Sequence, residues 1–295
     1  MSDRLRRDIK IALVVAVTAL TAMMSAGAAE PESAGVETLR PVNAAWMLEG
    51  GTSHLGDTYL SPLKYTGWNA AFSYERMQAM KFSPERWNMQ WRMGVEVNGA
   101  DNPSGNATMY YASVNLSWGM MRRFTLPWGF GAGAGGYAGV NGGCVYSSRN
   151  GNNPAAAKAD VAIGVTGYLY RRFSIGRLPV MMKWQTQLPL AGAFFSPEYD
   201  ELYYEIYLGN RRNLAHFAWP GNFFRWDNLV TADLDLGNTH LVFGMRSRVY
   251  STGVNNINTR IFSWGAVIGV GGDFLSVNPR KGCPGDDTVR IVYAY

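Results

Sequence analysis

The sequence predicts an all-β fold, an antiparallel transmembrane β-barrel of about ten strands. Three observations support this prediction. Apolar and polar residues alternate along much of the chain, glycine and aromatic residues are abundant, and a predicted export signal precedes them. The 34 glycines, 10 tryptophans and 16 tyrosines among 295 residues suit curved strands that carry rings at the boundaries between water and lipid.

Residues 1–28 have the features of a signal peptide. A basic start is followed by an apolar run from Ile11 to Leu20 and by the small residues Ala26-Gly27-Ala28, which offer a cleavage site. The run is too short to span a bilayer comfortably as a helix, so a retained anchor helix is the less favoured alternative. We therefore expect export through the general secretory route, with removal of the signal, to the outer membrane.

After the signal, we divide the chain into three parts. Residues 29–40 are expected to be a short linker, residues 41–275 the barrel and residues 276–295 a C-terminal tail. The formal net charge of +5 is spread without a basic stripe, so the composition gives no reason to invoke nucleic acid.

The clearest strand lies between Arg86 and Val97. Every second residue from Trp87 onward is apolar, whereas the residues between them are polar or glycine. A helix would mix these two sets, but a strand places them on opposite faces. Similar alternation predicts strands at 66–75, 110–119, 180–187 and 262–274, and weaker patterns predict strands at 44–51, 128–137, 160–170, 226–236 and 240–250.

The predicted connections differ in length between the two ends of the barrel. Short links at 76–85, 120–127, 171–179 and 237–239 are expected on the periplasmic side, and longer ones at 52–64, 98–107, 138–159, 188–225 and 251–260 outside. Residues 199–208 and 214–224 also alternate, and counting them as strands gives a twelve-stranded alternative. We prefer a loop there, because prolines and glycines interrupt the stretch.

A soluble β-sandwich or lipocalin-like barrel is the other interpretation of the alternation. Large aromatic residues near strand ends, such as Trp87, Trp118, Trp128 and Trp264, favour the membrane, where they would form girdles at the interface. The glycines at 129, 131, 133 and 135 share one face of their strand, and such small residues let a barrel curve tightly or let a neighbouring side chain cross its interior.

Several motifs resemble a family of exported Gram-negative proteins of unknown function. They include Gly56-Asp57-Thr58-Tyr59-Leu60-Ser61-Pro62-Leu63, Phe82-Ser83-Pro84-Glu85-Arg86-Trp87 and Phe194-Phe195-Ser196-Pro197-Glu198-Tyr199. The resemblance covers most of the chain after the signal and excludes the tail after Pro279. It implies an outer-membrane-type barrel and supplies no activity.

The polar faces of the strands predict a charged lumen. The lumen-lining candidates are Glu49, Glu75, Arg92, Glu96, Lys183, Asp233, Arg246 and Arg248. In a barrel of this size they are expected to pair with one another and plug the interior; a selectivity lining for small solutes or ions is the alternative.

The predicted outer loops carry the second set of candidates. These contact residues are His54, Asp57, Tyr199, Tyr203, His216 and Trp219. They suggest a surface protein that binds an extracellular ligand or protein; a hydrolase at the rim that uses His54 or His216 is a weaker hypothesis, because no spacing is diagnostic. We predict no catalytic, cofactor-binding or metal-binding residues, and outer-membrane lipid as the constant partner.

Overall fold

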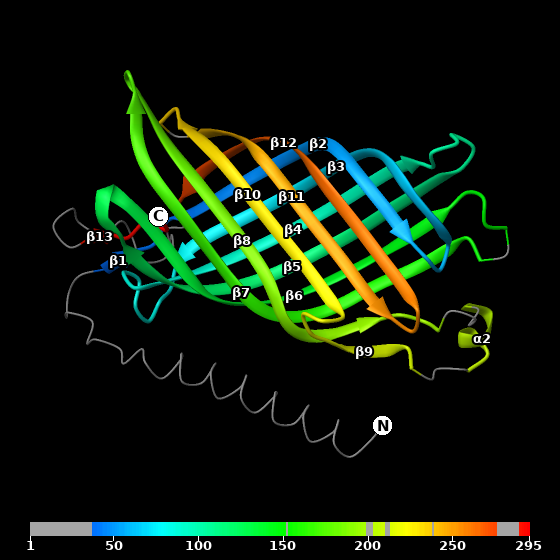
Figure 1. Ribbon diagram of the computed structural model, residues 1–295. Coiled ribbons are helices and arrows are strands. Elements are labelled where there is room, and N and C mark those ends of the chain that lie inside the picture. The colour runs from blue at the N-terminus through cyan, green and yellow to red at the C-terminus, as the bar shows by residue number, and fades with distance from the viewer. Residues whose placement is uncertain (1–36, 152, 199–202, 210–212, 238, 276–288) are drawn as a thin grey trace, which may run out of the picture.

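In the computed structural model, ten long antiparallel strands close into a barrel (Figure 1). The structure describes residues 37–151, 153–198, 203–209, 213–237, 239–275 and 289–295. The barrel strands are β2 (Val42–Asp57), β3 (Ser61–Ala79), β4 (Trp87–Asp101), β5 (Thr108–Thr125), β6 (Phe130–Ser147), β7 (Ala155–Ile175), β8 (Leu178–Phe195), β10 (Phe223–Asp235), β11 (His240–Val254) and β12 (Ile257–Phe274). Pairing of β12 with β2 and of β8 with β10 closes the sheet, which confirms the predicted fold and strand number.

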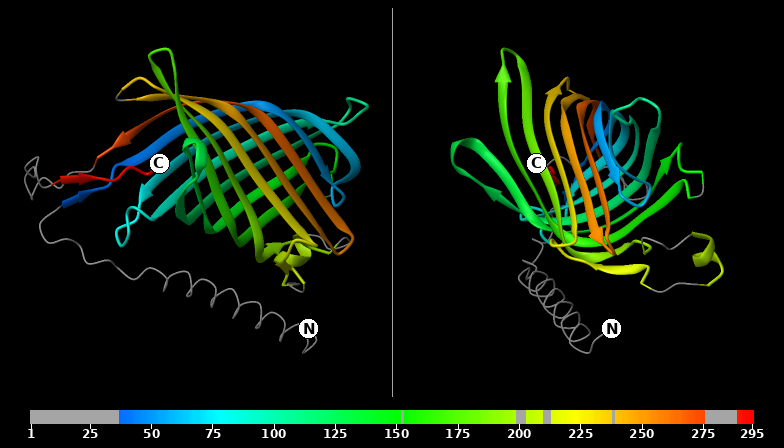
Figure 2. Two further views of the ribbon diagram at one scale, coloured as in Figure 1. Left: turned by 60° about the vertical axis from the view of Figure 1, so that its left-hand side comes forward. Right: turned by 45° about the vertical axis from the view of Figure 1, so that its right-hand side comes forward.

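Five short elements accompany this wall among the described residues. One is a 3-10 turn, η1 (Pro127–Gly129), between β5 and β6. β1 (Glu37–Leu39) and β13 (Val289–Ile291) pair in parallel at the end of the barrel where the described chain begins and ends. β9 (Ala215–Ala218) pairs with the far end of β8, and α2 (Tyr203–Tyr207) lies beyond that opposite rim (Figure 2). Helix α2 and the four-residue β9 occupy the region that the twelve-stranded alternative assigned to two further barrel strands. The predicted signal peptide lies outside the described residues.

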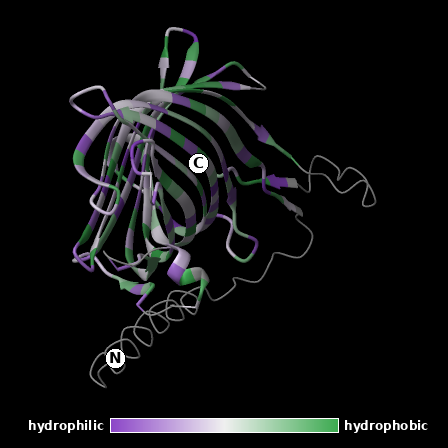
Figure 3. Cartoon of the chain, turned by 90° about the vertical axis from the view of Figure 1, so that its right-hand side faces the viewer, coloured by the Kyte–Doolittle hydropathy of each residue, from purple (hydrophilic) through white to green (hydrophobic). Residues whose placement is uncertain are grey.

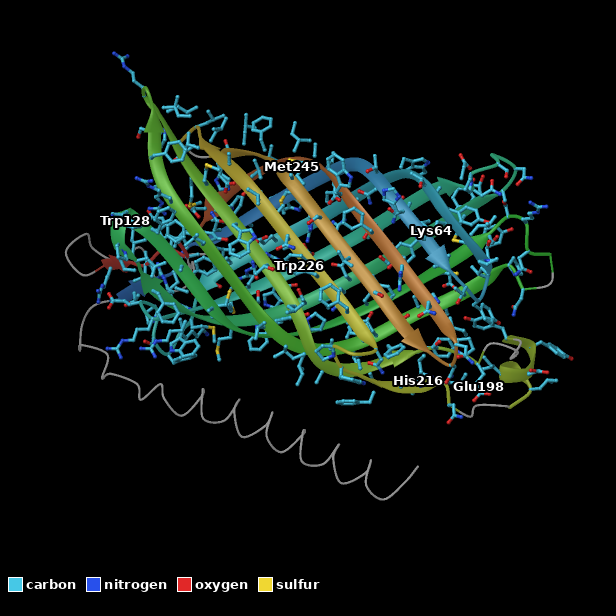
Figure 4. All side chains as sticks on the ribbon, viewed as in Figure 1. Lys64, Trp128, Glu198, His216, Trp226 and Met245 are labelled. Carbon is cyan, nitrogen blue, oxygen red and sulfur yellow. The ribbon has the colours of Figure 1, made fainter. Side chains whose placement is uncertain are left out.

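Alternate side chains face opposite sides of the wall, as the sequence predicts. Leu48, Trp68 and Val114 on the outer face are 60%, 51% and 59% exposed, whereas their sequence neighbours Glu49, Asn69 and Ser113 are buried. Figure 3 shows polar and apolar residues alternating along the strands, and Figure 4 labels Trp226 and Met245, both exposed on the outer face. An apolar outside around a polar inside is the arrangement that a bilayer requires of a barrel.

The strands are 13 to 21 residues long and extend further than the alternation suggested. Four of the five connections at the end opposite the termini are therefore short hairpins, and only residues 196–222 form a long excursion. The prediction of long loops at 52–64, 98–107, 138–159 and 251–260 was wrong. Inward-facing apolar residues, described below, give these strand extensions a core to pack on. At the terminal end, the β7–β8 hairpin projects beyond the rim (Figure 2).

Glycines on the inner face of β6 make room for two tyrosines of β7. Gly131 and Gly133 lie opposite Tyr170 and Tyr168, and a Cβ atom added at either glycine would lie 2.3 Å from the facing ring. The rings therefore lie flat over β6, where side chains would otherwise stand. Gly131 and Gly133 thus have the predicted role, whereas Gly129 lies in the short helix before β6 and Gly135 approaches the backbone of Met120.

We predict that Gly133→Ala lowers the free energy of unfolding by about 1–3 kcal/mol, because the new methyl group overlaps the Tyr168 ring. Gly142→Ala on the same strand is the control: nothing lies within 4 Å of its Cβ position, so its effect should stay within about 0.5 kcal/mol. Urea unfolding of both proteins in detergent, followed by heat-dependent gel mobility, measures the difference. Equal effects of the two substitutions would contradict the packing described for Tyr168.

Candidate functional site

The lumen is filled by side chains in successive layers. At the rim opposite the termini, inward-facing apolar residues pack into one cluster, which we call the outer apolar cluster. Its largest members are Leu55, Tyr65, Met109, Tyr111, Phe194, Phe223, Tyr250 and Ile261. Each of these side chains is at most 6% exposed. An apolar plug of this kind excludes water from the outer mouth of the barrel.

Two ion pairs lie beside this cluster. Lys158 Nζ is 2.6 Å from Asp57 Oδ2, and Arg225 Nη1 is 2.7 Å from Asp160 Oδ1. Thr259 donates a further hydrogen bond to Asp57, and Asn141 donates one to Asp160. Each buried carboxylate therefore has both a charged partner and a neutral donor, which is the condition for burying it without a large penalty.

The middle of the lumen is held by two arginines of β11. Arg248 donates to both oxygens of Glu49, at 2.9 and 2.7 Å, and its Nη1 lies 3.5 Å from Glu96 Oε2. Arg246 binds Asp227 through two nitrogens, at 3.0 and 2.7 Å. These two-nitrogen contacts are among the strongest that a side chain can make.

A small cavity of about 60 Å³ lies between the middle arginines and the outer apolar cluster. Its walls include the three tyrosines Tyr111, Tyr137 and Tyr250, together with Arg225 and Arg248. This volume accommodates a few water molecules and no larger solute.

Toward the termini, a third layer centres on Glu75. Gln185 and Gln90 donate to Glu75 Oε1, at 2.6 and 3.1 Å, and Arg92 Nε lies 3.5 Å from Glu75 Oε2. Arg92 also donates to Gln185. Close by, Lys183 Nζ is 2.5 Å from Asp233 Oδ2.

The C-terminal residue closes this layer. Tyr295 accepts a hydrogen bond from Gln185 at 3.0 Å, and its hydroxyl donates to Glu75 at 3.3 Å. Its ring makes edge contacts with Tyr168 and Tyr170, with centroid separations of 5.4 and 5.5 Å. Lys183 Nζ lies 5.1 Å from the centroid of the Tyr295 ring, within the range of a cation–π contact. We call these contacts the Tyr295 socket.

Backbone contacts hold the chain that carries Tyr295. Asn88 donates to the carbonyl oxygen of Ala294 at 2.7 Å, and Arg172 donates to that of Tyr295 at 3.1 Å. Pairing of β13 with β1 fixes the preceding residues. Beyond the socket, a vestibule of about 810 Å³, lined in part by Asp233, His240 and Tyr295, opens at this end of the barrel.

The structure brings together all eight residues proposed for the lumen. Seven of them are at most 8% exposed, the side chain of Arg248 is 14% exposed, and each lies in one of the ion pairs above. Sequence reasoning missed Asp227, the partner of Arg246, and Tyr295. It also missed two further ion pairs of the lumen, Asp57 with Lys158 and Asp160 with Arg225. Asp57 and Lys158 lie in segments that the sequence analysis assigned to loops. Arg225 and Asp227 flank the outward-facing Trp226, and this alternation could have placed both side chains in the lumen.

The residues expected in outer loops are dispersed. His54 and Asp57 lie in β2, contrary to prediction: His54 is exposed on the outer face, where its ring stacks on Phe262, and Asp57 is buried in the lumen. Tyr203 lies in α2, His216 in β9 and Trp219 in the turn after it, whereas Tyr199 lies outside the described residues. Figure 4 labels His216 near the rim opposite the termini.

The histidine contacts differ from those of a hydrolase. His54 Nδ1 lies 3.2 Å from Thr66 Oγ1, and His216 Nε2 lies 3.0 Å from the carbonyl oxygen of Ser196. Within the described residues, His240 alone of the three approaches a carboxylate, Asp233 at 4.0 Å, and it lies at the opposite end. In the same part of the chain, no group of three or more His, Cys, Asp or Glu side chains could hold a metal ion, and no helix is long and apolar enough to cross a membrane.

The fold and the filled lumen define an outer-membrane-type β-barrel. The sequence matches the model of a family described as "Protein of unknown function (DUF3316)" over residues 11–281, and the chain belongs to this family. This match confirms the resemblance seen in the motifs. No curated protein sequence matches the chain.

Solved structures of outer-membrane proteins are similar in fold. The outer membrane protease OmpT from Escherichia coli is 6% identical, with a TM-score of 0.46 over 80% of this chain and 97% of that one. The β domain of the Bordetella autotransporter BrkA is 11% identical, with a TM-score of 0.39 over 79% and 100% of the two chains. An outer membrane channel from Pseudomonas putida F1 is 9% identical, with a TM-score of 0.34 over 83% and 100%. These identities are too low to transfer any activity.

We predict that Arg248→Met lowers the free energy of unfolding by about 3–5 kcal/mol, because Glu49 and Glu96 lose the charge that compensates their burial. Arg260→Met, at an exposed position on the outer face of β12, is the matched control and should be nearly neutral. Adding Glu49→Gln and Glu96→Gln to Arg248→Met should restore most of the loss. Urea unfolding in detergent measures the stability of the two single variants and of the triple variant. Failure of the two added substitutions to restore stability would contradict the pairing.

Proposed function

We propose that this protein is a non-conducting outer-membrane barrel that anchors the 196–222 segment at the cell surface, where that segment binds an extracellular ligand or protein. In this proposal the signal peptide directs export and is removed. The termini face the periplasm and the long 196–222 connection faces the outside, as in other barrels of this class. The protein has no enzymatic activity of its own.

One observation carries this proposal: side chains close the lumen at three successive levels. The outer apolar cluster fills one mouth, paired charges fill the middle and the Tyr295 socket closes the third layer. An ion entering this path would have to displace apolar side chains from one another and break ion pairs that are buried from water. The same layers argue against the alternative of a narrow channel.

The 196–222 segment is the part of the outer rim best placed to bind a partner. Tyr204, Leu208 and Trp219 are 67%, 66% and 54% exposed. The segment is also fixed to the barrel: the Ala157 amide donates to the Tyr203 hydroxyl at 2.6 Å, and the Tyr203 ring packs edge-on against Tyr59. Burial raises the pKa of the Tyr203 hydroxyl. Exposed aromatic residues on a fixed support are typical of binding surfaces.

The contacts of the histidines support a binding role over hydrolysis. A Ser–His–Asp site needs a histidine whose second nitrogen is oriented by a carboxylate. His54 faces outward at the barrel wall while Asp57 is held in the lumen by Lys158. Asp57, which lies three residues after His54 in the sequence, is therefore on the opposite face of β2 and does not orient the His54 ring.

We predict that the folded protein gives no steady conductance steps in a planar bilayer. Removal of residues 289–295 should leave the bilayer silent, because the outer apolar cluster and the middle ion pairs remain. Heat-dependent gel mobility shows that each sample is folded, and a known porin in the same bilayers shows that insertion is detectable. Reproducible steps from the intact protein would contradict the proposal and favour a channel.

We also predict that the 196–222 segment is accessible on intact cells. An epitope inserted after Gly209, an exposed position beyond α2, should bind antibody without permeabilisation. The matched insertion after Gly237, at an exposed turn of the terminal end, should bind antibody only after permeabilisation. The reverse result would contradict the proposed orientation.

A further inference from the structure

The outer face of the barrel carries an apolar groove that the proposed function does not use. Its volume is about 530 Å³, and it crosses the wall from β4 to β9. Its lining includes Trp91, Trp118, Ala138, Ile163, Ala191 and Phe217. In a membrane barrel this face meets hydrocarbon, so an apolar occupant is required.

The strand register explains the shape of the groove. Trp91, Trp118, Ala138, Ile163 and Ala191 are successive cross-strand partners on five neighbouring strands, so they form one row perpendicular to the strands. Ala138 and Ala191 are short, whereas Trp118 and Ile163 beside them are long. Because Ile163 stands between the two alanines, the trough is uneven and deepest over Ala138 and Ala191. A flexible chain that bends around Ile163 fits it better than a broad, flat partner surface.

Two arginines lie near this row, one beside its β4 end and one on β5 between the row and the terminal rim. Arg76 on β3 is the cross-strand partner of Trp91, and Arg122 follows Trp118 by four residues on β5. The guanidinium of Arg122 lies 5.9 Å from the centroid of the Phe124 ring. Arg76 donates to Gln78 at 3.0 Å, while its buried Nε has no hydrogen-bond partner among the described residues.

Further charges surround these two arginines. Lys81 is exposed at the adjoining β3–β4 turn, and the nearby acid Glu85 is ion-paired with Arg290. This corner of the barrel is therefore positively charged. It lies at the terminal rim, where lipid headgroups would meet the wall.

We propose that the groove and this basic corner together bind one anionic phospholipid. Its phosphate would contact Arg76 and Arg122, and one acyl chain would lie along the trough toward Ala138 and Ile163. Arginine suits phosphate because its planar donors bind two oxygens at once. The apolar trough and the cationic end together match an amphiphilic molecule. A second protein chain docked on this face would not require these two features.

Native mass spectrometry of the full, folded protein in detergent tests the proposal. Phosphatidylglycerol should bind at least about tenfold more tightly than phosphatidylcholine with the same acyl chains, because charge-assisted bonds to phosphate are strengthened when the headgroup carries net charge. Arg76→Gln with Arg122→Gln should remove this preference. Lys64→Gln with Arg260→Gln, which neutralises two exposed basic residues on the outer face at the other end of the barrel, should keep it (Figure 4).

A second pair of variants tests the trough. Ala138→Trp should block it and weaken binding of long-chain phosphatidylglycerol, whereas Val114→Trp, also on the outer face and 59% exposed, should leave binding unchanged. Heat-dependent gel mobility shows that the variants fold. Binding without preference for the anionic lipid, a preference unaffected by the arginine substitutions, or a protein dimer that Ala138→Trp abolishes would each overturn the proposal.

Discussion

The closed wall of the barrel imposes the constraint on which the rest of the structure depends. Because alternate side chains of ten strands point into one narrow space, each charge there must find an opposite charge within the lumen. Lys158 compensates Asp57, Arg225 compensates Asp160, and Arg248 compensates Glu49 and Glu96. These pairs join strands that are distant in the sequence, so they fix the interior as one body.

The closure near the termini shows how a local sequence feature determines a distant contact. Glycines on β6 let Tyr168 and Tyr170 lie flat, and the flat rings form two sides of the socket for Tyr295. Glu75, the acceptor of the Tyr295 hydroxyl, is 220 residues away in the sequence. Tyr295 thus completes the packing of a barrel whose strand β12 ends at Phe274.

The sequence predicted the strands of the barrel wall, because alternation with period two identifies a strand that has one apolar and one polar face. The segment around Trp91 and Arg92 shows this, since every residue faces the side that its polarity suggests. Alternation failed at the far ends of the strands, where inward residues such as Leu55 and Tyr65 are apolar. There the outward-facing neighbours, such as His54, Lys64 and Thr66, are polar, so the pattern of an apolar outer face and a polar inner face no longer holds.

The Tyr295 socket was beyond sequence reasoning for a different reason. It depends on the register that places Gly133 opposite Tyr168 and on a chain segment that returns from outside the wall. The ion-pair partner of Arg246 could not be predicted for the same reason. Asp227 and Arg246 become neighbours only when β10 and β11 pair in the observed register.

The central claim is that the interior is a filled, paired core closed by the C-terminal residue. A photo-reactive amino acid placed at position 295, followed by mass-spectrometric mapping of the cross-links in the folded protein, tests it most directly. The account predicts cross-links to Tyr168, Tyr170 and Gln185 inside the same chain. Cross-links only to other molecules, or none to inward-facing residues of the barrel, would contradict it.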